Sequence, residues 1–422
     1  MASLHNKFRP LLAARSAALA ASILLASGLA YGQAVNSCLD CHSAQPGRLE
    51  VTPEKFSQDI HAQKGLTCVS CHGGDASNYD PDQAMSRKAG WKGKIDRRQV
   101  PQLCGSCHSN PAFMRQYNPS LRTDQLDQYH TSMHGKRLAA GDTRVAVCVD
   151  CHSVHDLRPP SDPRSPVNPV NVAKTCSRCH SDAALMKPYG IPTDQFANYS
   201  TSVHHEAVAV RGDLSAPTCT TCHGNHGALP PGVDKVQNVC SNCHVFQAQM
   251  YGKSSHFKAF QDKGLPGCVV CHSNHAIHMP SDAMLGTGSS GVCMKCHAPG
   301  DRCDNARASI LGNLTQLDQS IKDADQSLRL AESAGMEVSE ARLSQDQAQD
   351  SLTKARVTIH TFQPALIDAD IQSGMKIAAA DLKAGKDAMV ERNHRRIGLS
   401  LCLLAIAFML VGLWLYIKKL EG

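Results

Sequence analysis

Nine copies of one five-residue motif constrain this chain more than any other feature of its sequence. The motif is Cys-x-x-Cys-His, it recurs between residues 38 and 297, and it uses 18 of the 20 cysteines. Two thiols three residues apart reach the two vinyl groups of one porphyrin, and the histidine that follows supplies an axial ligand to the iron. The motifs therefore predict nine covalently bound c-type haems. The cysteines are Cys38, Cys41, Cys68, Cys71, Cys104, Cys107, Cys148, Cys151, Cys176, Cys179, Cys219, Cys222, Cys240, Cys243, Cys268, Cys271, Cys293 and Cys296. The proximal histidines are His42, His72, His108, His152, His180, His223, His244, His272 and His297.

Two other uses of cysteine compete with this interpretation. Zinc ribbons also contain Cys-x-x-Cys pairs, but they have no role for a histidine after every second cysteine. Exported chains normally pair their cysteines as disulfides, and the regular spacing with a trailing histidine argues against that. Because only 42% of the 422 residues are hydrophobic, an apolar core would be thin, and we expect the porphyrins to fill the interior. The predicted fold is mainly α with extensive loops and sparse secondary structure around the haems.

A longer repeat surrounds the motifs and supplies candidates for the second axial ligand. Tyr-x-x-Ser-x-His precedes three motifs, Phe-x-x-Asp-x-His precedes a fourth, and Cys-x-x-Cys-His-x-x-His occurs three times. The repeat suggests one lone haem near Cys38 followed by four two-haem modules, which begin at Cys68, Cys148, Cys219 and Cys268. A histidine three residues beyond a proximal histidine cannot reach around to its own iron, so it should serve a neighbouring haem. The distal candidates in register are His61, His134, His155, His204, His226, His256 and His275, and the further candidates are His278 and His360.

Each distal candidate has a plainer alternative as a surface or structural histidine. That alternative is favoured for His130 and His205, which lie outside the register, and for His278. His360 could cap the last haem, near Cys293. Axial methionine would raise the potentials, whereas bis-histidine ligation keeps them low. With this surplus of imidazole, the methionines near the motifs are expected to serve as packing.

Both ends of the chain predict export and membrane attachment. Residues 1–34 combine basic residues, an Ala/Leu-rich run and small residues, which is typical of a secretory signal peptide, with an uncleaved anchor as the alternative. Residues 397–417 form a run without a charge that is long enough to cross a bilayer as one helix. We therefore expect residues 35–396 outside the cytoplasm and the tail at 418–422 inside. A formal charge of +6 without a Lys/Arg-rich stripe is a weak footprint for nucleic acid, so no nucleic-acid partner is expected.

Between the haem region at 35–303 and the membrane run, residues 304–396 predict a helical hairpin and a stalk. Ile310, Leu314, Leu317, Ile321, Ala324, Leu328 and Ala331 form a heptad seam. Gly335 should end the first helix, Ser339 should cap a second that runs to about Thr361, and Pro364 should open a third that continues into the span. The stalk could be a spacer that docks a partner, or it could simply pack on itself. Cys303 is expected to be a buried, inert thiol, and His394 to meet lipid headgroups.

The nine motifs, the Tyr-x-x-Ser-x-His signals and the Cys-His-x-x-His variants resemble the periplasmic multihaem cytochromes c of respiratory bacteria. The ending Cys-His-Ala-Pro-Gly-Asp-Arg-Cys-Asp, followed by a helical hairpin and one span, resembles a membrane-anchored, nonahaem branch of that family. The resemblance implies electron transfer on the periplasmic face of the cytoplasmic membrane. It also implies a quinone-reactive membrane cytochrome or iron–sulfur subunit and periplasmic redox proteins as partners.

Two functions follow as expectations. The first is an electron carrier, in which nine bis-histidine haems pass electrons between a quinone-linked membrane partner and a periplasmic or outer-membrane acceptor. The second is a reductase of nitrite, hydroxylamine or a sulfur oxyanion, which needs one haem with an open distal position. The Cys38 and Cys293 haems have no distal histidine in repeat register, so an open iron is expected at one of these two sites if the chain is an enzyme. We favour the carrier.

Overall fold

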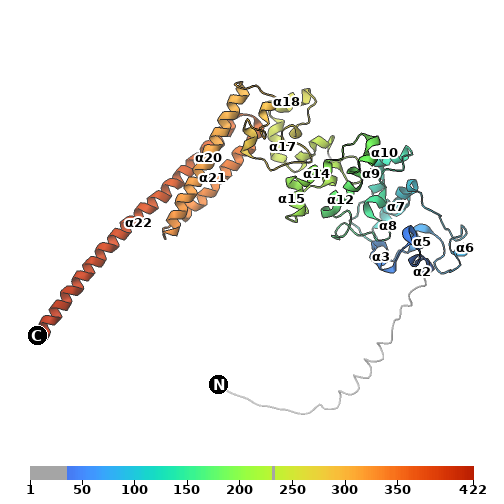
Figure 1. Cartoon of the computed structure of the whole chain (residues 1–422), viewed down its shortest axis with the longest axis horizontal. Helices are drawn as coiled ribbons and strands as arrows, with labels where there is room; N and C mark the ends of the chain where they lie inside the picture. The colour runs from blue at the N-terminus through green and yellow to red at the C-terminus, as the bar shows by residue number, and fades with distance from the viewer. Residues whose placement is uncertain (1–35, 231–232) are drawn as a thin grey trace, which may run out of the picture. The chain divides into compact units, whose positions relative to one another are not determined.

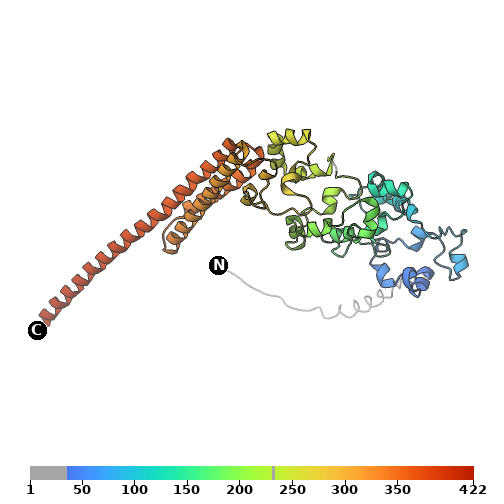
Figure 2. The same cartoon turned by 45° about the horizontal axis from the view of Figure 1, so that its top comes forward.

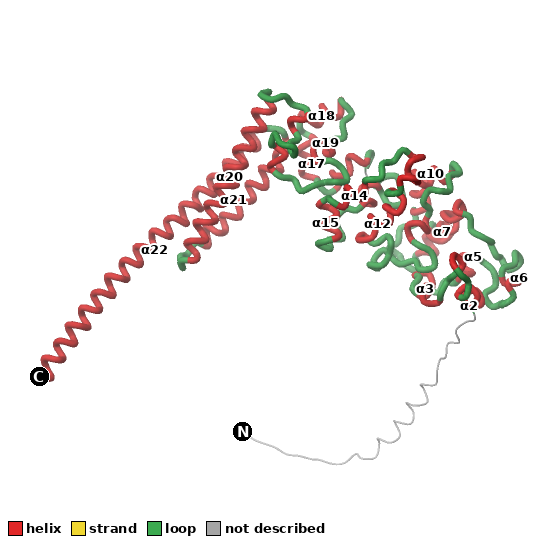
Figure 3. Tube along the Cα trace, in the orientation of Figure 1, coloured by secondary structure: helices red, strands yellow, loops and turns green. Residues whose placement is uncertain are grey.

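The computed structural model describes residues 36–230 and 233–422, so the expected signal peptide at 1–34 lies outside the described residues. The described chain is mainly helical and contains no strand, and long loops join its shorter helices (Figure 3). It divides into two compact units, which are described separately. Of the described residues, the first comprises 36–119 and 147–159, and the second comprises 120–146, 160–230 and 233–422.

The first unit has short helices and almost no apolar interior. Among its described residues, only the hydrophobic side chains of Val100, Met114 and Val147 are buried. Three buried side chains cannot stabilise a unit of this size, which agrees with an interior formed by large bound groups. The α-helices and 3₁₀-helices are α2 (Ser37–Ser43), η1 (Gly47–Leu49), α3 (Pro53–Ser57), α4 (Ile60–Gln63), α5 (Cys68–His72), α6 (Pro81–Ala84), η2 (Arg97–Gln99), α7 (Val100–His108), α8 (Pro111–Met114) and α11 (Cys148–His152).

The part of the second unit that carries motifs is built in the same way. Its helices are α9 (Gln125–Thr131), α10 (Met133–Ala139), α12 (Pro169–His180), α13 (Ala183–Met186), η3 (Lys187–Tyr189), α14 (Gln195–Ser200), α15 (Val203–Ala209), α16 (Cys219–His223), η4 (Val236–Asn242), α17 (Val245–Gly252), α18 (Ser255–Asp262), α19 (Cys268–His272), η5 (Asp282–Leu285) and η6 (Cys293–Lys295). Most are two turns or shorter, and a glycine directly follows η3, α16 and η5.

The remainder of the second unit is a three-helix stalk formed by α20 (Arg302–Ser333), α21 (Ser339–Thr358) and α22 (Pro364–Glu421), with η7 (Ile359–Thr361) before α22. Figures 1 and 2 show α21 lying beside α20, and the first half of α22 lying along both. The helix ends agree with the sequence pattern, since Gly335 has a φ of +77° just after α20 and Pro364 opens α22. Ser339 is the first residue of α21 rather than its cap, and the residue before it is Val338.

The stalk contains the main apolar core of the described chain. All seven residues of the predicted heptad seam are buried on α20. Ile310, Leu314, Leu317 and Ile321 form one core with Leu352 and Ala355 of α21 and Ile367 and Ile371 of α22. Gly374 lets α22 approach α20 closely, because a Cβ there would lie 3.0 Å from the methyl groups of Leu317. The heptad prediction is thus confirmed, and the stalk packs on itself.

Helix α22 continues far beyond this bundle. Its C-terminal part is the one segment among the described residues that is long and apolar enough to cross a membrane, and none of that window is buried against protein. The predicted span at 397–417 therefore belongs to the same unbroken helix as the stalk.

Candidate haem-binding sites

Each Cys-x-x-Cys-His motif is folded so that its three functional side chains share one face. Seven motifs end an α-helix or form one, and those at Cys240 and Cys293 lie in or directly after the 3₁₀-helices η4 and η6. At 100° per residue, side chains at positions i, i+3 and i+4 fall within one 100° arc of a helix. A planar ring can therefore be bound by both sulfurs while the imidazole points at its centre. No cysteine among the described residues forms a disulfide.

Seven proximal histidines face a second histidine ring. The ring centroids are 6.0 Å apart for His108 and His61, 6.1 Å for His72 and His155, 6.2 Å for His180 and His134, 6.5 Å for His244 and His204, 5.9 Å for His223 and His275, 6.0 Å for His297 and His256, and 6.0 Å for His272 and His360. A metal-to-imidazole bond is about 2 Å long and the centroid lies roughly 1 Å beyond the bound nitrogen, so two rings on opposite sides of one iron have centroids about 6 Å apart. The observed spacing therefore fits haem iron held between two imidazoles.

The pairing follows one rule along the repeat. The histidine upstream of each module faces the second site of that module, as His61, His134, His204 and His256 do. The histidine three residues beyond a proximal histidine faces the first site of the preceding module, as His155 and His275 do. His360 takes this role for the last module, so it lies beside His272 and not beside His297, where the sequence suggested it.

The repeated serine and tyrosine position the upstream histidines. Ser202 caps α15, because its hydroxyl accepts the backbone N–H of His205 at 3.1 Å, and Ser132 and Ser254 cap α10 and α18 in the same way. The hydroxyl of Tyr199 donates to the carbonyl of Pro217 at 3.0 Å, two residues before Cys219. The repeat therefore fixes where the helix with the distal histidine begins and ties it to the next motif.

In the degenerate copy, Asp59 replaces the serine and makes more contacts. Its carboxylate, which is 2% exposed, accepts the backbone N–H of His61 at 2.8 Å and lies 3.2 Å from the Nδ1 of the same residue. It also accepts the N–H of Leu157 at 2.9 Å, which ties the loop of His155 to α4. Hydrogen bonds from His61 and Leu157 lower the pKa of Asp59 despite its burial. This one carboxylate orients two distal candidates.

The loops that carry the downstream histidines adopt an uncommon backbone conformation. Ser153 and His155 have φ values of 72° and 64°, and Ser273 and His275 have 65° and 53°. Left-handed φ is costly for residues with a side chain, and it persists where the surroundings enforce it. The same conformation at equivalent positions of two repeats turns each imidazole away from its own motif and toward a neighbouring one.

Cysteines of successive motifs lie next to one another. Among the first cysteines, Cys38 lies beside Cys68, Cys104 beside Cys148, Cys176 beside Cys219 and Cys240 beside Cys268. Second cysteines are close enough for their charges to interact in Cys71 with Cys107 and Cys222 with Cys243, and Cys271 interacts with Cys293 in the same way. Within each unit, the sites thus follow one another in space in their sequence order. The close contacts between first cysteines cross the module boundaries that the repeat suggested.

Burial keeps many of the opposed imidazoles neutral. It is the largest cause of a pKa below the ordinary 6.5 at His72, His155, His180, His204, His223, His256 and His272. Only neutral imidazole has a free lone pair for a metal, so these environments favour ligation at neutral pH.

Some neighbours of the rings carry no signal in the sequence. Trp91 stacks on His72 with centroids 5.6 Å apart, and Phe362 lies 3.9 Å from His256. The carboxylate of Asp301 lies 3.4 Å from the Nδ1 of His297. Aspartate beside a ligating imidazole makes it more basic. Only the position of Asp301, four residues after His297 at the start of a helix, could have suggested that contact.

The remaining histidines lie in other surroundings. His130 and His205 contact the rings of Tyr129 and Tyr199, and His278 and His394 are exposed. His152 and His226 are half-buried and both have contacts, and burial lowers the pKa of His226. Their assignment as proximal and distal ligands stays a prediction. The Nδ1 of His42 lies 2.9 Å from the carbonyl oxygen of Leu49.

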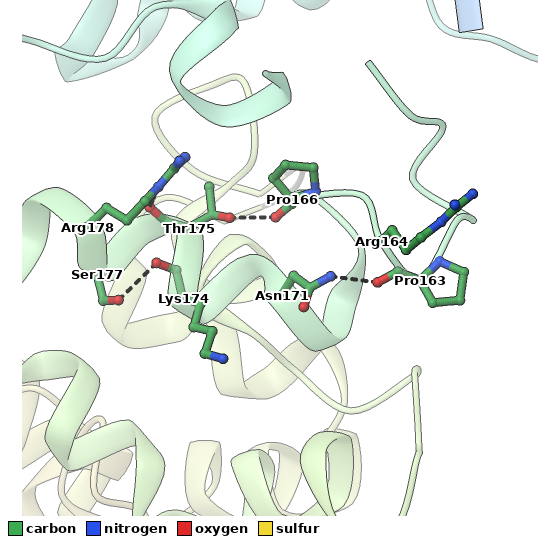
Figure 4. Close-up of a pocket in the computed structure, with 8 residues that line it drawn as sticks. All are labelled: Pro163, Arg164, Pro166, Asn171, Lys174, Thr175, Ser177 and Arg178. Carbon is green, nitrogen blue, oxygen red and sulfur yellow. Dashed lines mark hydrogen bonds between the residues drawn. The ribbon is translucent and has the colours of Figure 1, made fainter. Parts of the chain in front are cut away.

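One open groove of about 550 Å³ lies beside a motif helix but is not part of its site (Figure 4). It lies between the loop at Pro163 and Pro166 and the face of α12 that carries Lys174 and Arg178. That face is roughly opposite the face of Cys176, since two residues are 200° apart on a helix. Arg164, Lys174 and Arg178 give the groove a cationic lining. Its loop is held by the Thr175 hydroxyl, which donates to the carbonyl of Pro166 at 2.7 Å.

Cysteine pairs, proximal histidines and opposed second rings define the class of multihaem c-type cytochromes. Residues 60–181, which include four of the motifs, match the family model of cytochrome c3. This similarity supports a multihaem cytochrome c with covalently bound haems that transfers electrons. Neither the comparison with curated proteins nor that with solved structures finds a match.

Proposed function

We propose that the chain is a membrane-anchored electron-transfer protein of the periplasm. Nine covalently attached c-type haems would supply one-electron redox chemistry at low potential. The chain would pass electrons between a quinone-reactive cytochrome or iron–sulfur subunit in the membrane and a periplasmic or outer-membrane acceptor.

The order of the cysteine contacts carries this proposal. In the first unit the neighbours run from Cys38 to Cys68, from Cys71 to Cys107 and from Cys104 to Cys148. In the second unit they run from Cys176 to Cys219, from Cys222 to Cys243, from Cys240 to Cys268 and from Cys271 to Cys293. Within each unit, each site thus has an attachment cysteine near one of a neighbouring site, and such a succession of close sites is the arrangement needed for electrons to move from site to site.

The residues of the chain hold and orient the redox groups. The cysteine pairs bind them, and the opposed imidazoles limit movement of the iron between the two oxidation states. Bis-histidine ligation also fills both axial positions, so it excludes substrates from the iron and favours a carrier over an enzyme. At seven sites the described residues offer both imidazoles.

Attachment to the membrane would be provided by the apolar end of α22. The segment is long enough to span, its surface is free of packing, and Lys418 and Lys419 follow it. The segment has no acidic residue to relay protons, so we propose that quinol oxidation takes place in a partner.

Mass spectrometry of the exported chain tests the proposal. We expect a mass increment of nine haems that survives denaturation. Replacing Cys293 and Cys296 by alanine should lower the increment to eight haems, and the matched control Cys303→Ser should leave it at nine because Cys303 belongs to no motif. A chain without attached haem, or with zinc in its place, would contradict the proposal. Reduction of the haems by a quinol should require the membrane partner.

A further inference from the structure

The first site differs from seven other sites in its second axial position. Seven proximal histidines face another imidazole about 6 Å away, and these include His297 of the Cys293 site, which is paired with His256. Of the two sites that lacked a ligand in register, the last is therefore closed. Among the described residues of the first unit, no ring contacts His42, and its imidazole makes one hydrogen bond, to the carbonyl of Leu49.

The His42 site is nevertheless well built. The N–H and the hydroxyl of Ser37 both donate to the carbonyl of Ala76 at 2.9 Å, which fastens α2 to the loop after α5. Asn36 caps α2 by accepting the N–H of Leu39 at 3.2 Å. Cys38 is in contact with Cys68, so the site lies beside its neighbour as the other sites do.

The hydrogen bond of His42 also selects its tautomer. A carbonyl oxygen can only accept, so Nδ1 carries the proton and donates it to Leu49 over 2.9 Å. The lone pair is then on Nε2, which is the nitrogen that can bind a metal. His42 is therefore prepared as a proximal ligand, while the described part of the first unit presents no imidazole to the opposite face.

The other described histidines of the first unit outside the motifs do not fill this position. His61 and His155, the distal candidates in the same unit, lie against His108 and His72. An iron held by one imidazole has a free or water-bound sixth position, which accepts small ligands, whereas an iron between two imidazoles is closed to them.

We propose that the haem at Cys38 and Cys41 has an exchangeable sixth position that binds small haem ligands, carbon monoxide in the ferrous state and cyanide in the ferric state. The inference rests on the proposed covalent attachment of haem. It goes beyond electron transfer, because it gives the series of haems one site that binds a small molecule.

Titration of the full-length holoprotein with carbon monoxide after reduction tests this inference. We expect one bound carbon monoxide per chain, and one high-spin iron among eight low-spin ones by electron paramagnetic resonance of the oxidised protein. Replacing Cys38 and Cys41 by alanine should lower the binding from one to none. In the control, Cys293 and Cys296 are replaced by alanine, and binding should stay at one. Haem content is measured in both variants, and eight attached haems in each shows that the rest of the chain has matured.

The outcomes separate this inference from the proposed function. Nine attached haems that are all low-spin and bind no carbon monoxide would overturn the open site and leave the relay intact. Binding that persists without Cys38 and Cys41 would place the open iron elsewhere and also overturn it. A chain without covalent haem would defeat the proposed function itself.

Discussion

Replacing His360 by alanine provides the sharpest test of the ligand pairs. His360 precedes α22 in the helical stalk, outside the motif region, yet its ring lies 6.0 Å from that of His272 with an interplanar angle of only 16°. If it binds the iron of the Cys268 haem, its removal opens one of nine sites. We expect one ninth of the haem to change from low to high spin, and one more carbon monoxide to bind per chain.

The cost in stability should be small beside this spectral change. The side chain makes one hydrogen bond outside the site, between its Nδ1 and the carbonyl oxygen of Val357 at 2.9 Å. Loss of such a bond costs about 1 kcal/mol. The matched control is His394→Ala, which removes an exposed histidine from α22 and should leave both spectra unchanged. His360→Met should keep the iron low-spin and raise the potential of one haem, since axial methionine favours the reduced state.

A double variant identifies the haem that is affected. With Cys268 and Cys271 also replaced by alanine, the additional high-spin iron should disappear, because its haem is no longer attached. With Cys293 and Cys296 replaced instead, it should persist. The reasoning is refuted if His360→Ala leaves the spin state of every haem unchanged, or if removal of the Cys293 haem abolishes the effect.

Three further predictions concern the last haem and the stalk. Asp301→Asn should raise the potential of the Cys293 haem by an amount on the order of tens of millivolts in a redox titration. The substitution removes the charge beside His297, while an asparagine still caps α20. An unchanged potential would show that Asp301 does not influence this haem. Leu317→Ala should destabilise the stalk by about 3–5 kcal/mol in denaturant unfolding, since Leu317 is fully buried, and a loss below 1 kcal/mol would show that the core is not packed as described. Burial raises the pKa of Asp381 above its ordinary 3.8, although Ser344 donates a hydrogen bond to it. The folded stalk therefore binds this proton more tightly than the unfolded chain, and it should lose stability as the pH rises above about 4. Asp381→Asn should abolish that loss, and the same pH dependence in the variant would show that Asp381 is not its cause.

Local features of this chain were predictable because they depend on short spacings. The motif fixes two cysteines and a histidine on one helical turn, and the heptad seam from Ile310 to Ala331 fixes one buried face of α20. The end of α20 before Gly335 and the start of α22 at Pro364 follow from backbone preferences of single residues. None of these depends on knowing which distant segments meet.

The ligand pairs were only partly predictable for the same reason. The register showed that His155 and His275 should serve neighbouring haems, but not which ones, because that depends on how the loops fold back. The left-handed φ of both residues sets the direction in which each loop turns, and neither residue type predicts a left-handed conformation there. His360 has no motif around it, and its partner emerged only when η7 packed against α17 beside the Cys268 site.

The length of α22 sets a distance that any redox partner has to bridge. His360 lies four residues before Pro364, and the apolar run begins at Ile397. With a rise of 1.5 Å per residue, the part of α22 between Pro364 and Ile397 is about 50 Å long. An electron does not tunnel through that much polypeptide, so under the proposed function a donor confined to the lipid would not reduce the haem beside His360. The proposed partner would have to project well above the bilayer, or carry its own cofactors up to that height.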